Sequence, residues 1–95
     1  MIRCPSPLPG VVVEDLERDV CLYRVDTDEV LVLNQSGSDV WRLVDGSTPV
    51  ELIIERLALA YQVDQETIRA DVVAVIEDLG GKGFLVDAAA GEGSP

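Results

Sequence analysis

The sequence predicts an α+β fold of the winged helix-turn-helix-like class, in which a three-stranded antiparallel sheet is followed by three helices. Three short segments rich in valine and leucine come first, with tight polar links between them. Three segments with apolar residues at helical spacing follow. Because a helix with one apolar stripe cannot bury it alone, the helices must pack on one sheet face and on each other. The 95 residues fit one domain (1–95), with an ordered core of about 10–86 and flexible ends.

The expected strands are Val11–Asp15, Arg18–Val25 and Glu29–Leu33, and the polar run Asp26–Asp28 forms the turn before the third strand. Tight links between short strands are typical of an antiparallel meander. Residues 1–9 contain three of the five prolines, so this segment is expected to be irregular or extended.

The first two helices carry clear start or stop signals. In the first, Ser36 is the expected N-cap, and Gly46 suits the position after the helix, where a positive φ is common. In the second, Thr48 is expected to cap, Pro49 to occupy the first turn and Glu51 to complete a capping box. The residues expected on the apolar sides of these two helices are Val40, Trp41, Leu43, Val44, Val50, Ile53, Ile54, Leu57, Ala58 and Tyr61.

The third helix is expected to begin with Asp64 as its cap and to end at Gly80–Gly81. After it, Gly83–Val86 forms either a small terminal strand or a packed tail. From Asp87 onward the small and polar residues predict a frayed end.

The charge of the chain limits the class of partner. The formal net charge is −11, and the seven basic residues are dispersed along the sequence. Such a chain repels nucleic acid and anionic membranes, whereas a DNA-binding protein normally shows a basic face. A basic or neutral peptide is the better partner. No segment is long enough to span a membrane, and the start lacks the apolar run of a signal peptide, so a cytoplasmic protein is expected.

The residues give little support for catalysis. The chain has no histidine, and none of its serines lies in a Gly-x-Ser-x-Gly nucleophile elbow. The run Gly80–Gly83 lacks the spacing of a phosphate-binding loop, and the acidic run Asp26–Glu29 lacks the glycine and glutamate of an EF-hand. Cys4 and Cys21 are too few for a disulfide framework or a zinc site, and Cys21 is expected to be a buried free thiol. We therefore expect no catalytic residue, no metal and no cofactor.

The third expected strand has an unusual pattern. After Glu29, the segment Val30–Leu33 consists of four apolar residues, whereas a strand with one wet face alternates. One explanation is a central strand with both faces covered. The other is an edge strand that stays open for a partner strand (β-augmentation), because the segment has no Pro, Lys or inward charge to protect an edge.

The third expected helix has an apolar arc that is wider than one packing seam needs. Its main stripe consists of Ile68, Val72, Val75 and Leu79. Beside this stripe lie Arg69, Val73 and Ile76, and the opposite flank carries Asp71 and Asp78. Two explanations stay open. Either the extra arc contacts the sheet, or Val73 and Ile76 line a groove whose other wall is the third strand. In the second case Arg69 at the mouth is placed to pair with a carboxylate of a bound peptide.

Several of these segments, in this order and spacing, resemble those of PqqD-like proteins, which are small peptide-binding domains also called RiPP recognition elements. The resemblance covers roughly residues 11–86. The segments that carry it are Leu33-Asn34, Ser36-Gly37, Trp41 with Leu43, Asp45-Gly46, the capped second helix, and Asp71-Val72 with Leu79, Gly83, Phe84 and Leu85.

The resemblance implies binding of the leader of a ribosomally synthesised precursor peptide by β-strand addition. In that family the leader pairs with the third strand and packs on the third helix. Asp71 is then either a salt-bridge partner or a groove residue. The peptide-binding residues implied for this chain are Val30, Leu31, Val32, Leu33, Arg69, Val72, Val73 and Ile76.

The same resemblance implies a standalone, non-catalytic protein that raises the effective concentration of a precursor peptide at a downstream modifying enzyme. That enzyme is either a leader protease acting with a cyclase, as in lasso-peptide biosynthesis, or a radical-SAM enzyme, as in the pyrroloquinoline quinone (PQQ) pathway.

Two other functions are considered. A dimerisation or scaffold domain would pair the same open strand with a second copy, giving a homodimer. A winged-helix transcription factor would place the third helix on DNA. That helix region has one arginine, Arg69, against five acidic residues, and so opposes phosphate binding. The five acidic residues are Asp64, Glu66, Asp71, Glu77 and Asp78.

Overall fold

The computed structural model describes residues 2–88 of the chain, and its elements follow the predicted order. One short strand, β1, is added at the start, and of the two alternatives for Gly83–Val86 the terminal strand is found, as β5. The elements are β1 (Pro5–Pro7), β2 (Val11–Leu16), β3 (Asp19–Arg24), β4 (Glu29–Leu33), α1 (Gln35–Leu43), α2 (Val50–Tyr61), α3 (Gln65–Gly81) and β5 (Leu85–Asp87). The α+β class, with a three-stranded antiparallel sheet followed by three helices, is therefore confirmed.

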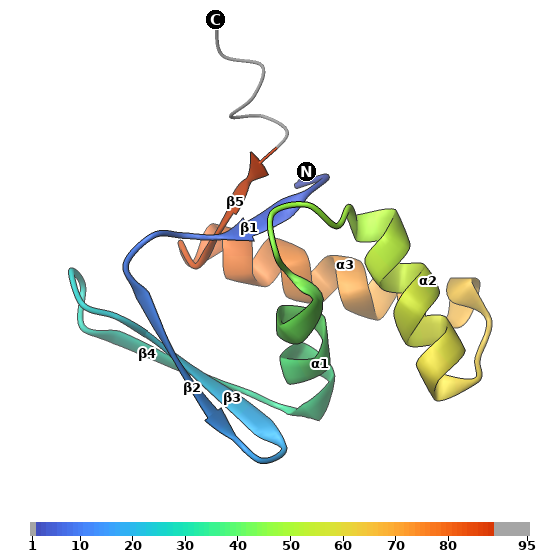
Figure 1. Ribbon diagram of the computed structural model, residues 1–95, viewed down its shortest axis with the longest axis horizontal. Helices are drawn as coiled ribbons and strands as arrows, with labels where there is room; N and C mark the ends of the chain where they lie inside the picture. Colours follow the sequence, from blue (N-terminus) through green and yellow to red (C-terminus); the bar gives the residue numbers. More distant parts are fainter. Residues whose placement is uncertain (1, 89–95) are drawn as a thin grey trace, which may run out of the picture.

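The main sheet is the predicted antiparallel meander, with the strand order β2-β3-β4. The three helices all lie to one side of this sheet (Figure 1), and α1 is the helix that contacts both β3 and β4. Residues alternate between the two faces of a strand. Val20, Leu22 and Leu33 are buried on the helix side, whereas Val30 and Val32 point to the other side and are exposed.

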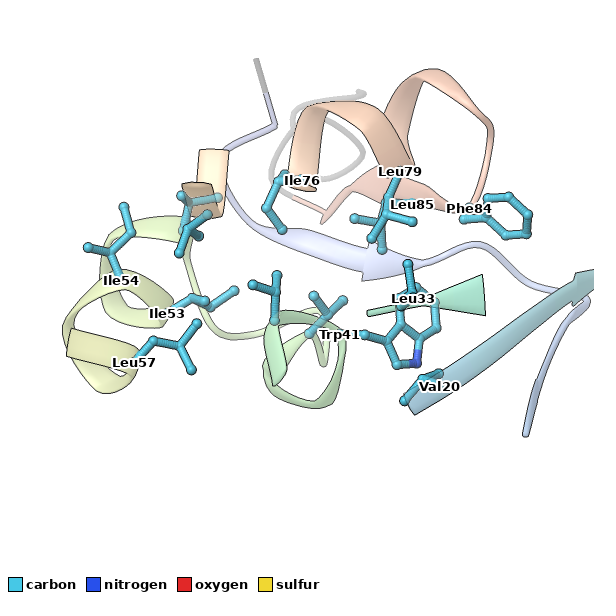
Figure 2. Close-up of a cluster of buried hydrophobic side chains, with 14 of the residues drawn as sticks. Val20, Leu33, Trp41, Ile53, Ile54, Leu57, Ile76, Leu79, Phe84 and Leu85 are labelled. Carbon is cyan, nitrogen blue, oxygen red and sulfur yellow. The ribbon is translucent and has the colours of Figure 1, made fainter. Parts of the chain in front are cut away.

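The core is built from side chains of all three helices, β3, β4 and the segment after α3, which converge on one cluster (Figure 2). Trp41 is only 6% exposed, as expected for a core residue. Phe84 and Leu85, next to the end of α3, are also buried. The apolar stripes of the helices are thus covered by the sheet and by one another.

A second, two-stranded sheet contains part of the N-terminal segment, which was expected to be irregular or extended. Its extended part is β1, which pairs antiparallel with β5 in the register Pro5↔Asp87 and Pro7↔Leu85. Pro is tolerated in such a short edge strand, where a missing N–H breaks few ladder bonds. The segment also accepts N–H groups from the helix layer, because Gly46 donates to Pro5 O (3.0 Å) and Val50 to Arg3 O (2.8 Å). The core therefore begins before residue 10, and residues 89–95 of the end expected to fray lie outside the described residues.

Two of the predicted helix caps are wrong. Asn34, not Ser36, is the N-cap of α1, and its side chain accepts the Gly37 N–H at 2.8 Å. At α2 the N-cap is Pro49, and no side chain caps it. The predicted capping box fails because the Thr48 hydroxyl donates instead to Asp45 Oδ2 (3.1 Å).

The loop between α1 and α2 is held by Asp45. Its carboxylate accepts the N–H groups of Ser47 and Thr48, both at 2.8 Å, which lowers the pKa of Asp45. α1 ends at Leu43, before the predicted stop at Gly46. Gly46 has the expected positive φ of 80°, a conformation that other residues adopt at a cost.

α3 follows its predicted span closely. It starts after Asp64, as expected, although no side chain caps its first turn. The helix ends at Gly81, within the pair Gly80–Gly81 that was expected to terminate it.

Candidate peptide-binding surface

β4 is an edge strand, which decides between the two explanations of its apolar pattern. One side of β4 pairs with β3, and within residues 2–88 no strand pairs with its other side. The Val30 and Val32 side chains are each 61% exposed. The strand is therefore not a central one covered on both faces, and an unpaired apolar edge is a template for another strand. We call this unpaired side of Val30–Leu33 the open edge.

The buried hydroxyl of Ser38 shows which backbone groups face the open edge. It accepts the Val20 N–H at 2.7 Å and donates to Leu33 O at 3.2 Å. Val20 and Leu33 are opposite each other on β3 and β4. Their backbone groups therefore point toward each other, into the space between the two strands, where the hydroxyl bridges them. Bonded and non-bonded pairs alternate along an antiparallel ladder. The next bonded pair is thus Leu22↔Leu31, and the backbone N–H and C=O groups of Val30 and Val32 point outward.

A strand added at the open edge would continue the alternation of the sheet. On the helix side of β4, Leu31 is half-buried and Leu33 is buried. Alternate side chains of an added strand would therefore point toward the helices, next to Leu31 and Leu33. The others would point to the exposed side, next to Val30 and Val32.

A cavity of about 250 Å³ opens among the three helices, close to the end of β4. Ser36, which follows β4 by three positions, is part of its lining. Its buried apolar lining residues are Val40, Leu57, Ile68 and Val72. Its rim includes Ser36, Tyr61, Val63, Thr67 and Asp71, which are exposed, and Val75, which is half-buried. An apolar cavity with a few polar groups at its rim is the usual form of a site for an apolar ligand group.

The structure does not bring the predicted helix residues together at this cavity. Arg69 turns toward α2, where its guanidinium lies 2.7 Å from the Glu51 carboxylate. Val72 and Ile76 are each only 1% exposed, and Val73 is half-buried against the core. Of the predicted helix residues, only Val72 lines the cavity. For Ile76, burial in the core favours the first of the two explanations, in which the extra apolar arc packs within the protein, and its side chain offers no surface to a groove.

The flank of α3 that does line the cavity is the opposite one, with Thr67, Asp71 and Val75. One residue of this flank, Asp71, is among those that the family resemblance allows at a groove. Ser36, Tyr61 and Val63 were missed because they come from three different segments, and no local pattern joins them.

The polar groups at the rim differ in their partners. The Tyr61 hydroxyl donates to Asp39, and burial together with this bond raises the pKa of Tyr61 to about 12. Asp39 also lies 3.5 Å from the Arg42 guanidinium. In contrast, no side-chain hydrogen bond or ion pair joins Asp71 to another residue of the described part of the chain. Asp71 is thus the carboxylate at the rim that is available to a ligand.

The described residues offer little for other chemistry. Between residues 2 and 88, no group of three Cys, Asp or Glu side chains is arranged to hold a metal ion. Within the described residues Cys4 and Cys21 form no disulfide and both are half-buried, so Cys21 is less buried than expected. No helix in the described range has the length and apolar character to cross a membrane.

Comparisons with known proteins point to one family. The sequence model of the family described as "Coenzyme PQQ synthesis protein D (PqqD)" matches residues 19–85. A "PqqA binding protein" of Rhodopseudomonas palustris (strain HaA2) is 41% identical over 61 residues, which are 64% of this chain and 60% of that relative. A protein of the same name from Gluconobacter oxydans is 31% identical over 71 residues, 75% of this chain and 73% of that relative. The chain thus spans about 60% of the length of the Rhodopseudomonas relative.

A solved structure has a similar fold. It is described as "TbiB1 in Complex with the TbiA(beta) Leader Peptide" and is 25% identical in sequence. The match has a TM-score of 0.77 and covers 84% of this chain and 93% of that chain.

Proposed function

Because the chain belongs to the PqqD family, we propose that it binds the leader of a ribosomally synthesised precursor peptide and catalyses no reaction itself. The observation that carries the proposal is the open edge of β4, whose last residue, Leu33, is three positions before Ser36 at the rim of the cavity among the helices. The relatives named as PqqA binding proteins and the solved TbiB1–leader complex support the same class of ligand.

In the proposed complex the leader adds as a strand to β4 and bonds to the outward N–H and C=O groups of Val30 and Val32. Each such bond contributes only about 1 kcal/mol net, and ordering the peptide costs several kcal/mol. Backbone pairing alone would therefore bind weakly. Burying one large apolar side chain contributes about 1.5–3 kcal/mol more, so contacts with Leu31, Leu33 and the helices are needed for affinity and for choice of sequence.

The revised peptide-binding residues keep the predicted strand Val30–Leu33 together with Val72. To these the proposal adds Asp71 and Val75 from the cavity side of α3. Arg69, Val73 and Ile76 are left out, because Arg69 is paired with α2 and the other two pack into the core.

The biological role would be to hold the precursor near a cytoplasmic modifying enzyme and so raise its effective concentration there. Of the two classes of partner enzyme, a radical-SAM enzyme of the type found in the PQQ pathway is favoured for this chain. The relatives named for PqqA are 31–41% identical to this chain, whereas TbiB1 is 25% identical. A lasso-peptide protease and cyclase are the alternative partners.

The proposal is tested by two proline variants of matched design. Val32→Pro places a ring and removes an N–H at the open edge, so it should block strand addition without breaking the bonds of β4 to β3. Val13→Pro is the control. Val13 lies on β2, at the opposite edge of the sheet, and pairs with Leu22 of β3. Its N–H also points away from the sheet.

Binding is measured by titrating each variant with a synthetic PqqA-type precursor and following the fluorescence anisotropy of the labelled peptide. We expect at least a tenfold loss of affinity for Val32→Pro and little change for Val13→Pro, with far-UV circular dichroism showing both folded. Equal affinities of the two folded variants would rule out strand addition at β4.

Self-association through the same edge is the second candidate, and the exposed valines of β4 favour it. Two copies that each carry a net charge of −11 would repel, which opposes it. Sedimentation of the protein without peptide separates the two: a monomer at the concentrations of the titration supports leader binding, and a stable dimer supports self-pairing.

A further inference from the structure

We propose that the cavity among α1, α2 and α3 is a subsite for two leader residues on the same face of the bound strand: one large apolar side chain that fills the cavity and one lysine or arginine that pairs with Asp71. This inference rests on the proposed function and adds to it the chemical class of leader that this chain selects.

The apolar half of the subsite follows from the size and lining of the cavity. A dry apolar cavity of roughly 150 Å³ accepts benzene, and this one is larger, at about 250 Å³. Its inner wall is formed by buried side chains of three helices, among them Val40, Leu57 and Val72. A leucine, phenylalanine or tyrosine side chain would therefore fit, and filling the cavity would remove apolar surface from water.

The position of the cavity ties it to the open edge. Ser36 belongs to its rim and follows Leu33, the last residue of β4, by three positions. A peptide strand paired with β4 that continues beyond Leu33 would thus reach the cavity within a few residues, since a strand advances about 3.3 Å per residue. The occupant is then a segment of the same bound leader.

The preference for a basic leader residue follows from which carboxylates near the cavity already have partners. Asp39 is already bonded to Tyr61 and lies near Arg42, so its charge is partly compensated. Asp71 has neither a hydrogen bond nor an ion pair through its side chain to any described residue. A cation of the ligand would be its first partner.

The basic residues on either side of Asp71 in the sequence, Arg69 and Lys82, are paired with other carboxylates. Arg69 lies 2.7 Å from Glu51 on α2, and Lys82 lies 3.0 Å from Asp78. The rim is therefore negative in a protein whose net charge is −11, and an acidic leader residue at this place would be repelled. Burial of the adjacent apolar side chain would also exclude water from the pair, which strengthens it relative to a fully exposed one.

A charge-reversal exchange tests the subsite. Each Lys or Arg of the synthetic PqqA-type precursor is replaced in turn by Glu, and each peptide is titrated into the wild-type protein and into Asp71→Lys. We expect one position at which Glu weakens binding to the wild type at least tenfold and at which Asp71→Lys restores at least half of the loss on a logarithmic scale. Alanine at an apolar residue two positions from that one, on the same face of the strand, should weaken binding to both proteins alike.

Glu77→Lys is the matched control, because it makes the same change of net charge on an exposed position of α3 that does not line the cavity. Rescue of the same peptide by Glu77→Lys would mean that overall charge, not Asp71, selects the ligand, and would overturn the inference. So would peptides that lose affinity in Val32→Pro but show no basic position coupled to Asp71. In that case leader binding at β4 still stands, and only the subsite fails.

Discussion

The two flanks of α3 have similar sequences but different surroundings. On one flank, Ile76 is buried and Arg69 pairs with Glu51 of α2. On the other, Asp71 and Val75 line an open cavity. Both flanks combine apolar residues with one charged residue, so composition does not distinguish the covered flank from the open one. What distinguishes them is whether the apolar side chain is covered and whether the charged residue has a partner among the described residues.

The difference between a covered and an open flank also explains why apolar and charged residues occur together on α3. A covered flank needs apolar side chains for stability. An open flank that receives a partner needs apolar side chains for affinity, together with a charge that is left without an internal partner. The pairing state of the charge, and not the hydrophobicity of its neighbours, separates the two flanks.

The largest expected effect comes from placing a charge on each flank in turn. Ile76→Asp buries a carboxylate in the core, which costs several kcal/mol, comparable with the 5–15 kcal/mol that stabilise an ordinary domain. We expect loss of the folded state, or a large drop in the urea midpoint, measured by circular dichroism.

Val75→Asp is the matched change on the open flank, one position away. Its side chain is half-buried beside the cavity, so the folded state should survive while affinity for the PqqA-type precursor falls at least tenfold. Equal unfolding by the two variants would show that the cavity flank is as closed as the other and would remove the distinction between them.

The local pattern of the sequence predicts most of this fold. Each strand of the meander and each helix lies within a few residues of its expected span, because alternation and helical spacing are local properties. The caps were less predictable: Asn34 and Ser36 are both good capping residues two positions apart, and Thr48 has a competing partner in Asp45.

Features that depend on distant residues were not predictable in the same way. β1 pairs with β5, which is almost the whole chain away in sequence, and two of its three residues are prolines, a residue type that is typical of loops. At the candidate site, the apolar run Val30–Leu33 was found because an unprotected edge is visible in one short segment. The cavity was not found, since α1, the end of α2 and one flank of α3 supply it together.

A smaller effect is expected from breaking the ion pair on the covered flank. Arg69 and Glu51 are both partly exposed, at 41% and 65% of their side chains, and such pairs contribute about 0.2–1 kcal/mol. Arg69→Ala should therefore lower the free energy of unfolding only slightly, and a double-mutant cycle with Glu51→Ala in urea should assign most of this change to the pair.

The same Arg69→Ala variant also tests the original placement of this residue at a groove. If Arg69 only fastens α3 to α2, the affinity for the PqqA-type precursor should stay within about twofold, equivalent to roughly 0.4 kcal/mol. A tenfold loss in the folded variant would bring Arg69 back into the binding surface and contradict the division between the flanks.

The smallest expected effect is the pH response of Tyr61, which stands at the rim of the open side. Burial, followed by its bond to Asp39, raises the pKa of Tyr61 to about 12 from an ordinary value of 10.0. A group that holds its proton more tightly in the folded state stabilises that state below the unfolded pKa, and the contribution is lost as pH rises from 10 toward 12. In Tyr23→Phe, which leaves Tyr61 as the remaining tyrosine, the phenolate absorbance should therefore appear above the pH at which the urea-unfolded chain ionises. Asp39→Asn should shift this midpoint part of the way down, because burial remains when the charged acceptor is removed. An ionisation midpoint equal to that of the unfolded chain would place the Tyr61 hydroxyl in open solvent. Tyr61 would then not form part of the rim of the cavity.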